Sequence, residues 1–119
     1  MGSSSDYENR AEAAEEMDEL IEEIITDAYN EEEQLWAFLQ VFEDQITLPV
    51  KALVIGQEVS VILFDYDGDN RRGITAKICR KDRAEHVVAA SEVVFPRGSI
   101  GARHIAAYRK WLGLEPRIE

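Results

Sequence analysis

The chain has 119 residues and a formal net charge of −11, with 24 acidic residues against 13 lysines and arginines. This length suits one domain with one modest core. The apolar runs are shorter than the roughly 18 residues of a membrane helix. The opening MGSSSDYENR lacks the basic and apolar parts of a secretion signal. We therefore expect a cytoplasmic protein, in which the single cysteine, Cys79, allows neither an intrachain disulfide nor a cysteine-based zinc site.

The charge is divided unevenly along the chain. Residues 1–45 contain fifteen acidic residues and one basic residue, Arg10, whereas the rest of the chain has a balance of +3. An acidic first half repels nucleic-acid phosphate and anionic lipid, and it attracts cations or a basic partner. We therefore expect no nucleic-acid partner and no membrane partner. The simpler explanation of the same residues is a set of solvated helix faces.

Two amphipathic helices are predicted in the acidic half. Apolar residues at three- and four-residue steps predict a helix over residues 9–28, preceded by a flexible tail at 1–8. Asn30 is placed to cap a second helix, whose first turn contains three glutamates at the positive end of the helix dipole. The aromatic residues of this helix, Trp36 among them, are expected in the core.

The basic half is predicted to form a small antiparallel sheet followed by a helix. Segments rich in Val, Ile and aromatic residues, separated by turn residues, predict three strands. They lie at 58–66, 73–81 and 86–95. Segment 45–57 is expected to connect the second helix to the first strand, and an apolar stripe ending at Gly113 predicts the closing helix. The fold class is therefore α+β: two N-terminal helices, a small antiparallel β-sheet or SH3-like half-barrel, and a C-terminal helix, in one domain over 9–119.

Three aspartates at alternate positions, Asp65, Asp67 and Asp69, fall in the hairpin between the first two predicted strands. Alternate side chains of an extended chain share one face, so these carboxylates repel one another unless a positive charge lies among them. Calcium takes six to eight oxygen ligands in irregular geometry, and three carboxylates with backbone carbonyls make a partial calcium cage. The neighbouring Arg71 and Arg72 offer an alternative, a solvated turn balanced by arginines.

Two other motifs fit these residues incompletely. In the spacing of an EF-hand loop, Asn70 stands where glycine is required and Ala76 where a bidentate glutamate is required. The segment ILFDYDGDN resembles the haloacid-dehalogenase-type phosphatases, but Asp69 replaces their threonine and the chain after it is too short for their α/β domain. Since no other segment supplies a nucleophile with its base, we expect a protein that is not an enzyme.

Residues 23–61, EIITDAYNEEEQLWAFLQVFEDQITLPVKALVIGQEVSV, resemble a family of small bacterial calcium-binding proteins. The family includes a cyanobacterial calcium-binding and buffering protein connected with heterocyst differentiation. The matching features are DAYNEEE, the aromatic helix ending in FED, LPVKA and GQEVSV, while Leu48, Pro49 and Val50 stand where many relatives have FPF. The resemblance implies Ca²⁺ as the ligand and a compact α+β fold, and the departures from the EF-hand pattern described above make the expected sites non-EF-hand sites.

The aspartate loop and this resemblance together predict the main calcium site. We place it at Asp65, Asp67 and Asp69, completed from the exit of the second helix by Glu43 or Asp44. The short connection after that helix is the reason for expecting its exit near the loop.

A second metal site is predicted at the junction of the two helices, from Asp27, Glu31 and Glu32, whose alternative role is helix capping. The expected function is an intracellular Ca²⁺ buffer or sensor. The alternative is a small-barrel interaction module without a specific metal site, whose basic face binds an acidic protein or nucleic acid. That face would consist of Arg71, Arg72, Lys77, Arg80, Lys81 and Arg83.

Overall fold

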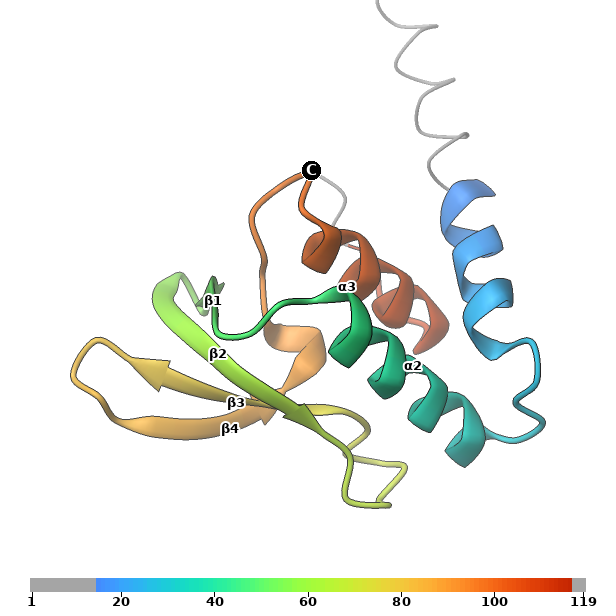
Figure 1. Cartoon of the computed structure of the whole chain (residues 1–119), viewed down its shortest axis with the longest axis horizontal. Coiled ribbons are helices and arrows are strands. Elements are labelled where there is room, and N and C mark those ends of the chain that lie inside the picture. The colour runs from blue at the N-terminus through green and yellow to red at the C-terminus, as the bar shows by residue number, and fades with distance from the viewer. Residues whose placement is uncertain (1–14, 117–119) are drawn as a thin grey trace, which may run out of the picture.

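Four antiparallel strands with helices packed on one face make up the fold of residues 15–116, which are the residues that the computed structural model describes (Figure 1). In this part of the chain the first helix covers residues 15–25. The other elements are α2 (Glu31–Gln45), β1 (Val50–Val54), β2 (Gln57–Asp65), β3 (Thr75–Arg80), β4 (Glu85–Ala89), the 3₁₀ helix η1 (Ala90–Glu92) and α3 (Ile100–Trp111). The predicted α+β class is confirmed. Within residues 15–116, no helix combines the length and the apolar character needed to cross a membrane.

The strands lie in the sheet in the order β1-β2-β3-β4, each antiparallel to its neighbour. The register of β2 against β3 shifts between Val61 and Leu63. The outer edge of β1 is joined to the segment before α3 at one position, where Leu53 and Val94 exchange backbone hydrogen bonds of 2.9 and 2.8 Å. β4 forms the opposite edge, and no other strand of the described residues pairs with its outer side.

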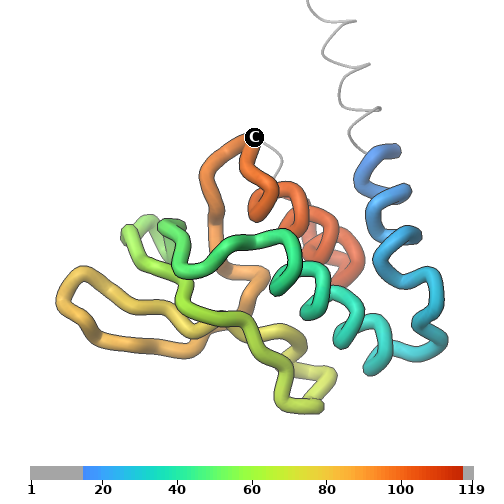
Figure 2. Tube along the Cα trace, in the orientation of Figure 1, coloured from blue at the N-terminus to red at the C-terminus, as the bar shows by residue number. Residues whose placement is uncertain are grey.

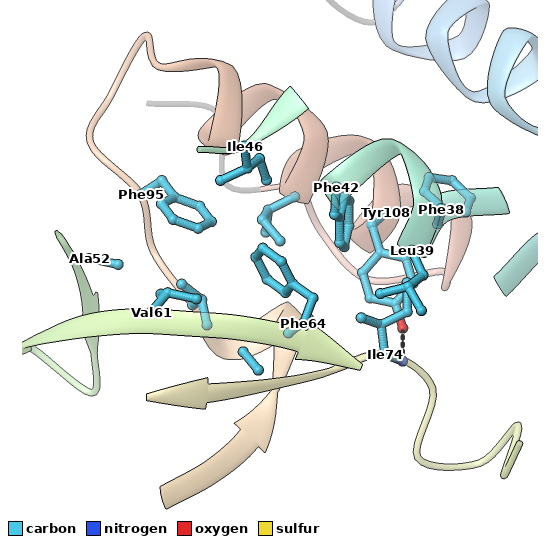
Figure 3. Close-up of a cluster of buried hydrophobic side chains, with 14 of the residues drawn as sticks. Phe38, Leu39, Phe42, Ile46, Ala52, Val61, Phe64, Ile74, Phe95 and Tyr108 are labelled. Atoms are coloured by element: carbon cyan, nitrogen blue, oxygen red, sulfur yellow. Dashed lines mark hydrogen bonds between the residues drawn. The ribbon is translucent and has the colours of Figure 1, made fainter. Parts of the chain in front are cut away.

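The core lies between the sheet and helices α2 and α3 (Figure 3). Alternation along β2 directs Val59 and Val61 toward the helices, and the register shift between Val61 and Leu63 brings Phe64 to the same face. The helical spacing of α2 buries one stripe of residues against them: Leu35, Phe38, Leu39 and Phe42. Tyr108 of α3 packs between Phe38 and Phe42, with ring centroids 5.4 and 5.5 Å away. These aromatic contacts fix how α2 and α3 lie over the sheet.

The first helix packs its apolar side on the same core and keeps its acidic side in solvent. Met17 is buried, and Asp18 forms an ion pair of 2.6 Å with Lys110 of α3. The predicted tail at 1–8 and residues 9–14 of the predicted helix lie outside the described residues.

Two predictions about the helical half are wrong. The first helix stops at residue 25 rather than 28, and Ala28 donates its N–H to the Ile25 carbonyl, 3.0 Å away, in the turn that leads to α2. Trp36 is 49% exposed rather than part of the core. Its position on α2 faces the loop after β2, where its ring meets the ring of Tyr66 edge-on.

The strand boundaries differ from the prediction at both ends of the sheet. Residues 50–54, expected to be part of a connection, form β1, since the chain turns back in two residues with positive φ and pairs with β2. The predicted strand at 86–95 ends before η1. There Ala90 donates its N–H to the carbonyl of Ile74 at 2.9 Å, and the chain turns inward away from the sheet edge.

Candidate metal centre

The loop between β2 and β3 is folded by its own aspartates. One oxygen of Asp65 accepts the N–H of Tyr66 at 2.8 Å, and one oxygen of Asp67 accepts the N–H of Asp69 at 2.9 Å. Asp69 accepts the N–H of Arg71, also at 2.9 Å. Short carboxylate side chains that bond to the backbone two residues further on are typical of turns. One oxygen of each predicted ligand therefore already shapes the loop.

Arg72 supplies a positive charge beside one of these carboxylates. Its Nη1 atom lies 2.9 Å from Oδ2 of Asp67, and the two side chains are 58% and 44% exposed. An ion pair this exposed contributes only about 0–1 kcal/mol. The arginine-balanced turn considered from the sequence is thus present at Asp67, in a form that another cation can displace.

Tyr66, which lies between Asp65 and Asp67 in the chain, fastens the loop to α2. Its side chain is only 3% exposed, and its ring centroid lies 5.1 Å from that of Trp36. Its hydroxyl donates to Oδ1 of Asn70. The loop therefore lies beside the N-terminal half of α2, as Figure 1 shows.

The Tyr66 hydroxyl lies within the electrostatic influence of carboxylates from two segments. Burial is the main cause that raises the pKa of the Tyr66 hydroxyl, and the negative charges of Glu32, Asp67, Glu31 and Asp69 raise it further. Two of these carboxylates belong to the first turn of α2 and two to the loop after β2. Carboxylates from both of the separately predicted sites therefore act on the same side chain.

The first turn of α2 holds these glutamates in place by a reciprocal cap. The Asn30 side chain accepts the N–H of Glu33 at 2.8 Å, and the Glu33 carboxylate accepts the N–H of Tyr29 at 2.7 Å. Capping is therefore carried out by the neighbours of Glu31 and Glu32. Both of these residues are exposed, and neither side chain has an ion pair or a hydrogen bond within residues 15–116.

The other predicted ligands lie in two places. Asp27 is exposed in the turn that leads into α2, close in the chain to Glu31. Glu43 and Asp44 are exposed in the last turn of the helix, about 18 Å along the axis from Glu31 at 1.5 Å per residue. Figure 2 shows the chain leaving that end of α2 toward β1, away from the aspartate loop. The structure therefore does not bring Glu43 and Asp44 together with the carboxylates around Tyr66.

One sequence signal could have indicated the contact between the loop and the first turn of α2. Tyr66 is an aromatic residue between two aspartates, two positions after the buried Phe64. Alternation along an extended chain directs both aromatic side chains to the same face. An inward-facing Tyr66 requires a partner from the helical layer, and Trp36 is that partner.

The carboxylates around Tyr66 do not form a finished metal cage. Within residues 15–116, no three side chains of Asp, Glu, His or Cys are grouped closely enough to hold an ion as they stand. The donor set nevertheless suits a hard cation, because it consists of exposed carboxylates and loop carbonyls and includes no thiolate or imidazole.

The basic residues of the alternative interaction face are partly paired with the protein's own acids. Besides Arg72, Lys77 lies 3.0 Å from Glu85 and Lys81 lies 3.8 Å from Glu58. These pairs reduce the positive charge that the sheet presents to an acidic partner.

No protein-family model and no curated protein matches the sequence. Two solved structures are similar to this one. The crystal structure of Anabaena CcbP gives a TM-score of 0.70 at 18% identity, covering 85% of this chain and 94% of that chain. A calcium binding protein in the calcium-binding form gives a TM-score of 0.66 at 19% identity, covering 83% and 90%. At these identities the likeness shows a common fold over nearly the whole of both proteins.

Proposed function

We propose that this protein is a calcium-binding protein, not an enzyme, which buffers or senses Ca²⁺ inside the cell. The ion binds between the β2–β3 loop and the first turn of α2. The observation that supports this place is the packing of Tyr66 on Trp36 of α2, with the charges of Glu31, Glu32, Asp67 and Asp69 all acting on the Tyr66 hydroxyl. The fold is shared with two proteins, one of them described as a calcium-binding protein in its calcium-binding form. Calcium requires six to eight oxygens, and the two segments offer carboxylates from opposite sides.

Binding at this place requires a local rearrangement, because the carboxylates are not yet grouped around one point. Asp67 exchanges Arg72 for the ion, and Asp65 and Asp69 turn their free oxygens toward it. Tyr66 stays packed on Trp36 and keeps the loop against α2. The ion supplies the positive charge that relieves the repulsion between the two acidic segments.

Calorimetry with the full chain and CaCl₂, in excess magnesium, tests the proposal, since flexible carboxylate sites prefer calcium over the strongly hydrated Mg²⁺. Asp67→Asn removes one charge at nearly constant shape and is expected to weaken calcium binding about tenfold, or about 1.4 kcal/mol. Glu19→Gln, on the exposed side of the first helix, is the matched control and should have little effect because distant exposed charges are screened. If Asp67→Asn and Glu19→Gln lost equal calcium affinity, calcium would be attracted diffusely to an acidic surface rather than bound at the loop.

Arg72→Gln tests the exchange at Asp67 from the opposite direction. Removing the competing cation is expected to strengthen calcium binding by about two- to fivefold, the worth of one exposed ion pair. Weaker binding by this variant would contradict the exchange.

Paired substitutions decide between the predicted sources of the remaining oxygens. Glu31→Gln with Glu32→Gln is expected to weaken binding, whereas Glu43→Gln with Asp44→Asn is expected to leave it nearly unchanged. If instead the Glu43→Gln, Asp44→Asn variant lost calcium affinity and the Glu31→Gln, Glu32→Gln variant kept it, the ligands would lie at the end of α2, which contradicts the proposed position. Asp27→Asn shows whether the turn before α2 takes part or holds a second ion.

A further inference from the structure

A groove lies on a different part of the molecule from the acidic loop. It is lined by β1, the segment that leads from η1 into α3, and the first half of α3, with Glu16 and Met17 of the first helix and Glu58 of β2. Its volume is about 1020 Å³. Neither the β2–β3 loop nor the first turn of α2 lines it. In Figure 1 β1 and the start of α3 lie away from the β2–β3 loop, which projects beyond the end of β2.

The walls of the groove expose three large apolar side chains that come from different elements. Ile100 is 56% exposed, Leu53 43% and Val94 36%. Leu53 and Val94 are held side by side by their two backbone hydrogen bonds, and Ile100 begins α3 next to them in the groove. Apolar side chains gathered in one concave surface, rather than scattered singly, indicate an interaction site.

Three basic residues line the groove, together with the acidic Glu16 and Glu58. Arg97 and Arg103 are exposed and line the groove on either side of Ile100 in the chain. Within residues 15–116 neither of them forms an ion pair or a hydrogen bond through its side chain. Lys51 is paired with Glu58 at 3.7 Å. On a chain with a net charge of −11, two arginines that have no acidic partner among the described residues and lie beside exposed apolar side chains favour an anionic, partly apolar partner.

We propose that this groove binds a short segment of a partner protein that combines large apolar side chains with Asp or Glu. The apolar side chains of the segment pack on Leu53, Val94 and Ile100, and its carboxylates pair with Arg97 and Arg103. A peptide fits better than a small molecule, because small-molecule sites enclose most of their ligand, whereas the three large apolar side chains of this groove remain more than a third exposed. An amphipathic segment laid in a groove is a common mode of peptide recognition.

A displayed library of random short peptides, selected on the full chain, tests this proposal. Selected peptides are expected to be enriched in acidic and large apolar residues. Their affinity, measured by fluorescence anisotropy, should fall about tenfold or more with Ile100→Asp and with Arg97→Glu plus Arg103→Glu, since truncated central anchors and unpaired charges dominate such losses. Arg80→Glu and Val87→Asp, exposed positions outside the groove, should leave the affinity unchanged, and thermal melts check that every variant is folded.

Three results would overturn the proposal. The first is selection of basic peptides, or of none. The second is peptide binding that survives both groove variants. The third is self-association in sedimentation that Ile100→Asp abolishes, which would make a second copy of this chain the occupant. Because the groove and the acidic loop share no residue, these results do not depend on whether the protein binds calcium.

Discussion

Gly73, at the end of the aspartate loop, lies against Tyr108 of α3. Its φ is +63°, and a Cβ atom on it would lie 2.5 Å from the hydroxyl oxygen of the buried Tyr108. That oxygen is held in place because it accepts the N–H of Ile74 at 2.9 Å, the dashed line in Figure 3. Gly73→Ala is expected to lower the free energy of unfolding by about 2–4 kcal/mol, from backbone strain and overpacking together.

Urea unfolding of Gly73→Ala beside Gly68→Ala separates these two causes. Gly68 also has a positive φ, +92°, but its Cβ would meet no atom within 4 Å, so only the strain of about 1–2 kcal/mol is expected. Equal losses at the two positions would mean that the close approach of Gly73 to Tyr108 has no energetic importance.

Tyr108 makes the stability of the protein depend on pH in the alkaline range. Burial raises the pKa of its hydroxyl, and the hydrogen bond from Ile74 offsets this only in part. The folded pKa therefore lies above the unfolded value of about 10. Above that pH the unfolded chain releases the proton first, so stability that is complete at lower pH is lost as the pH rises.

Above pH ~10, the free energy of unfolding of Tyr108→Phe should fall less steeply with pH than that of the parent protein. At neutral pH it should be less stable by about 1–3 kcal/mol, because the buried N–H of Ile74 loses its acceptor. Tyr29→Phe, at a side chain that is 86% exposed, is the control and should change neither property. A parallel decline in the parent and Tyr108→Phe would refute the assignment to Tyr108.

At the scale of elements, the N-terminal cap of α2 joins helix stability to the proposed calcium site. Asn30→Ala removes the acceptor of the Glu33 N–H and should cost about 1 kcal/mol of stability. The first turn that frays also carries Glu31 and Glu32, so calcium affinity should fall as well, whereas Asn30→Ser should preserve both. Chemical unfolding and calcium titration of the same samples measure the two effects, and an unchanged affinity in Asn30→Ala would argue against ligands in this turn.

Elements with a strong local pattern could be predicted from the sequence, and contacts between distant elements could not. The apolar stripe and cap of α2 are local, as is the hairpin around Asp67, and the structure contains both. β1 has only five residues, and its strand conformation depends on pairing with β2. The position of the aspartate loop was missed for the same reason, because the contact between Trp36 and Tyr66 joins segments thirty positions apart. Trp36 is apolar, but its exposure is set by this contact rather than by its place in the helix.

At the scale of the whole molecule, the acidic half should make metal-free stability depend on salt. Residues 1–45 carry fifteen acidic residues, and screening of their mutual repulsion should raise the melting temperature as NaCl is added. Calcium should raise the melting temperature more than NaCl of equal ionic strength does. A ligand that binds only the folded state stabilises it by about 2.7 kcal/mol at a hundred times its Kd. Melting scans in CaCl₂ and MgCl₂ at matched ionic strength provide the measurement. Identical melting curves in the two salts would mean that calcium stabilises the protein only by screening its charges.

The two edges of the sheet, β1 and β4, also determine whether copies of this protein can aggregate by strand pairing. The exchange of hydrogen bonds between Leu53 and Val94 covers part of the β1 side, so β4 offers the open edge among the described strands. Two molecules that paired through β4 would each use up that edge, and growth by strand addition would stop at a pair rather than continue into a fibril. β4 itself has only five residues and starts with the polar Glu85 and His86, features that discourage edge pairing. We therefore expect this protein to remain dispersed at high concentration even when its acidic charge is screened.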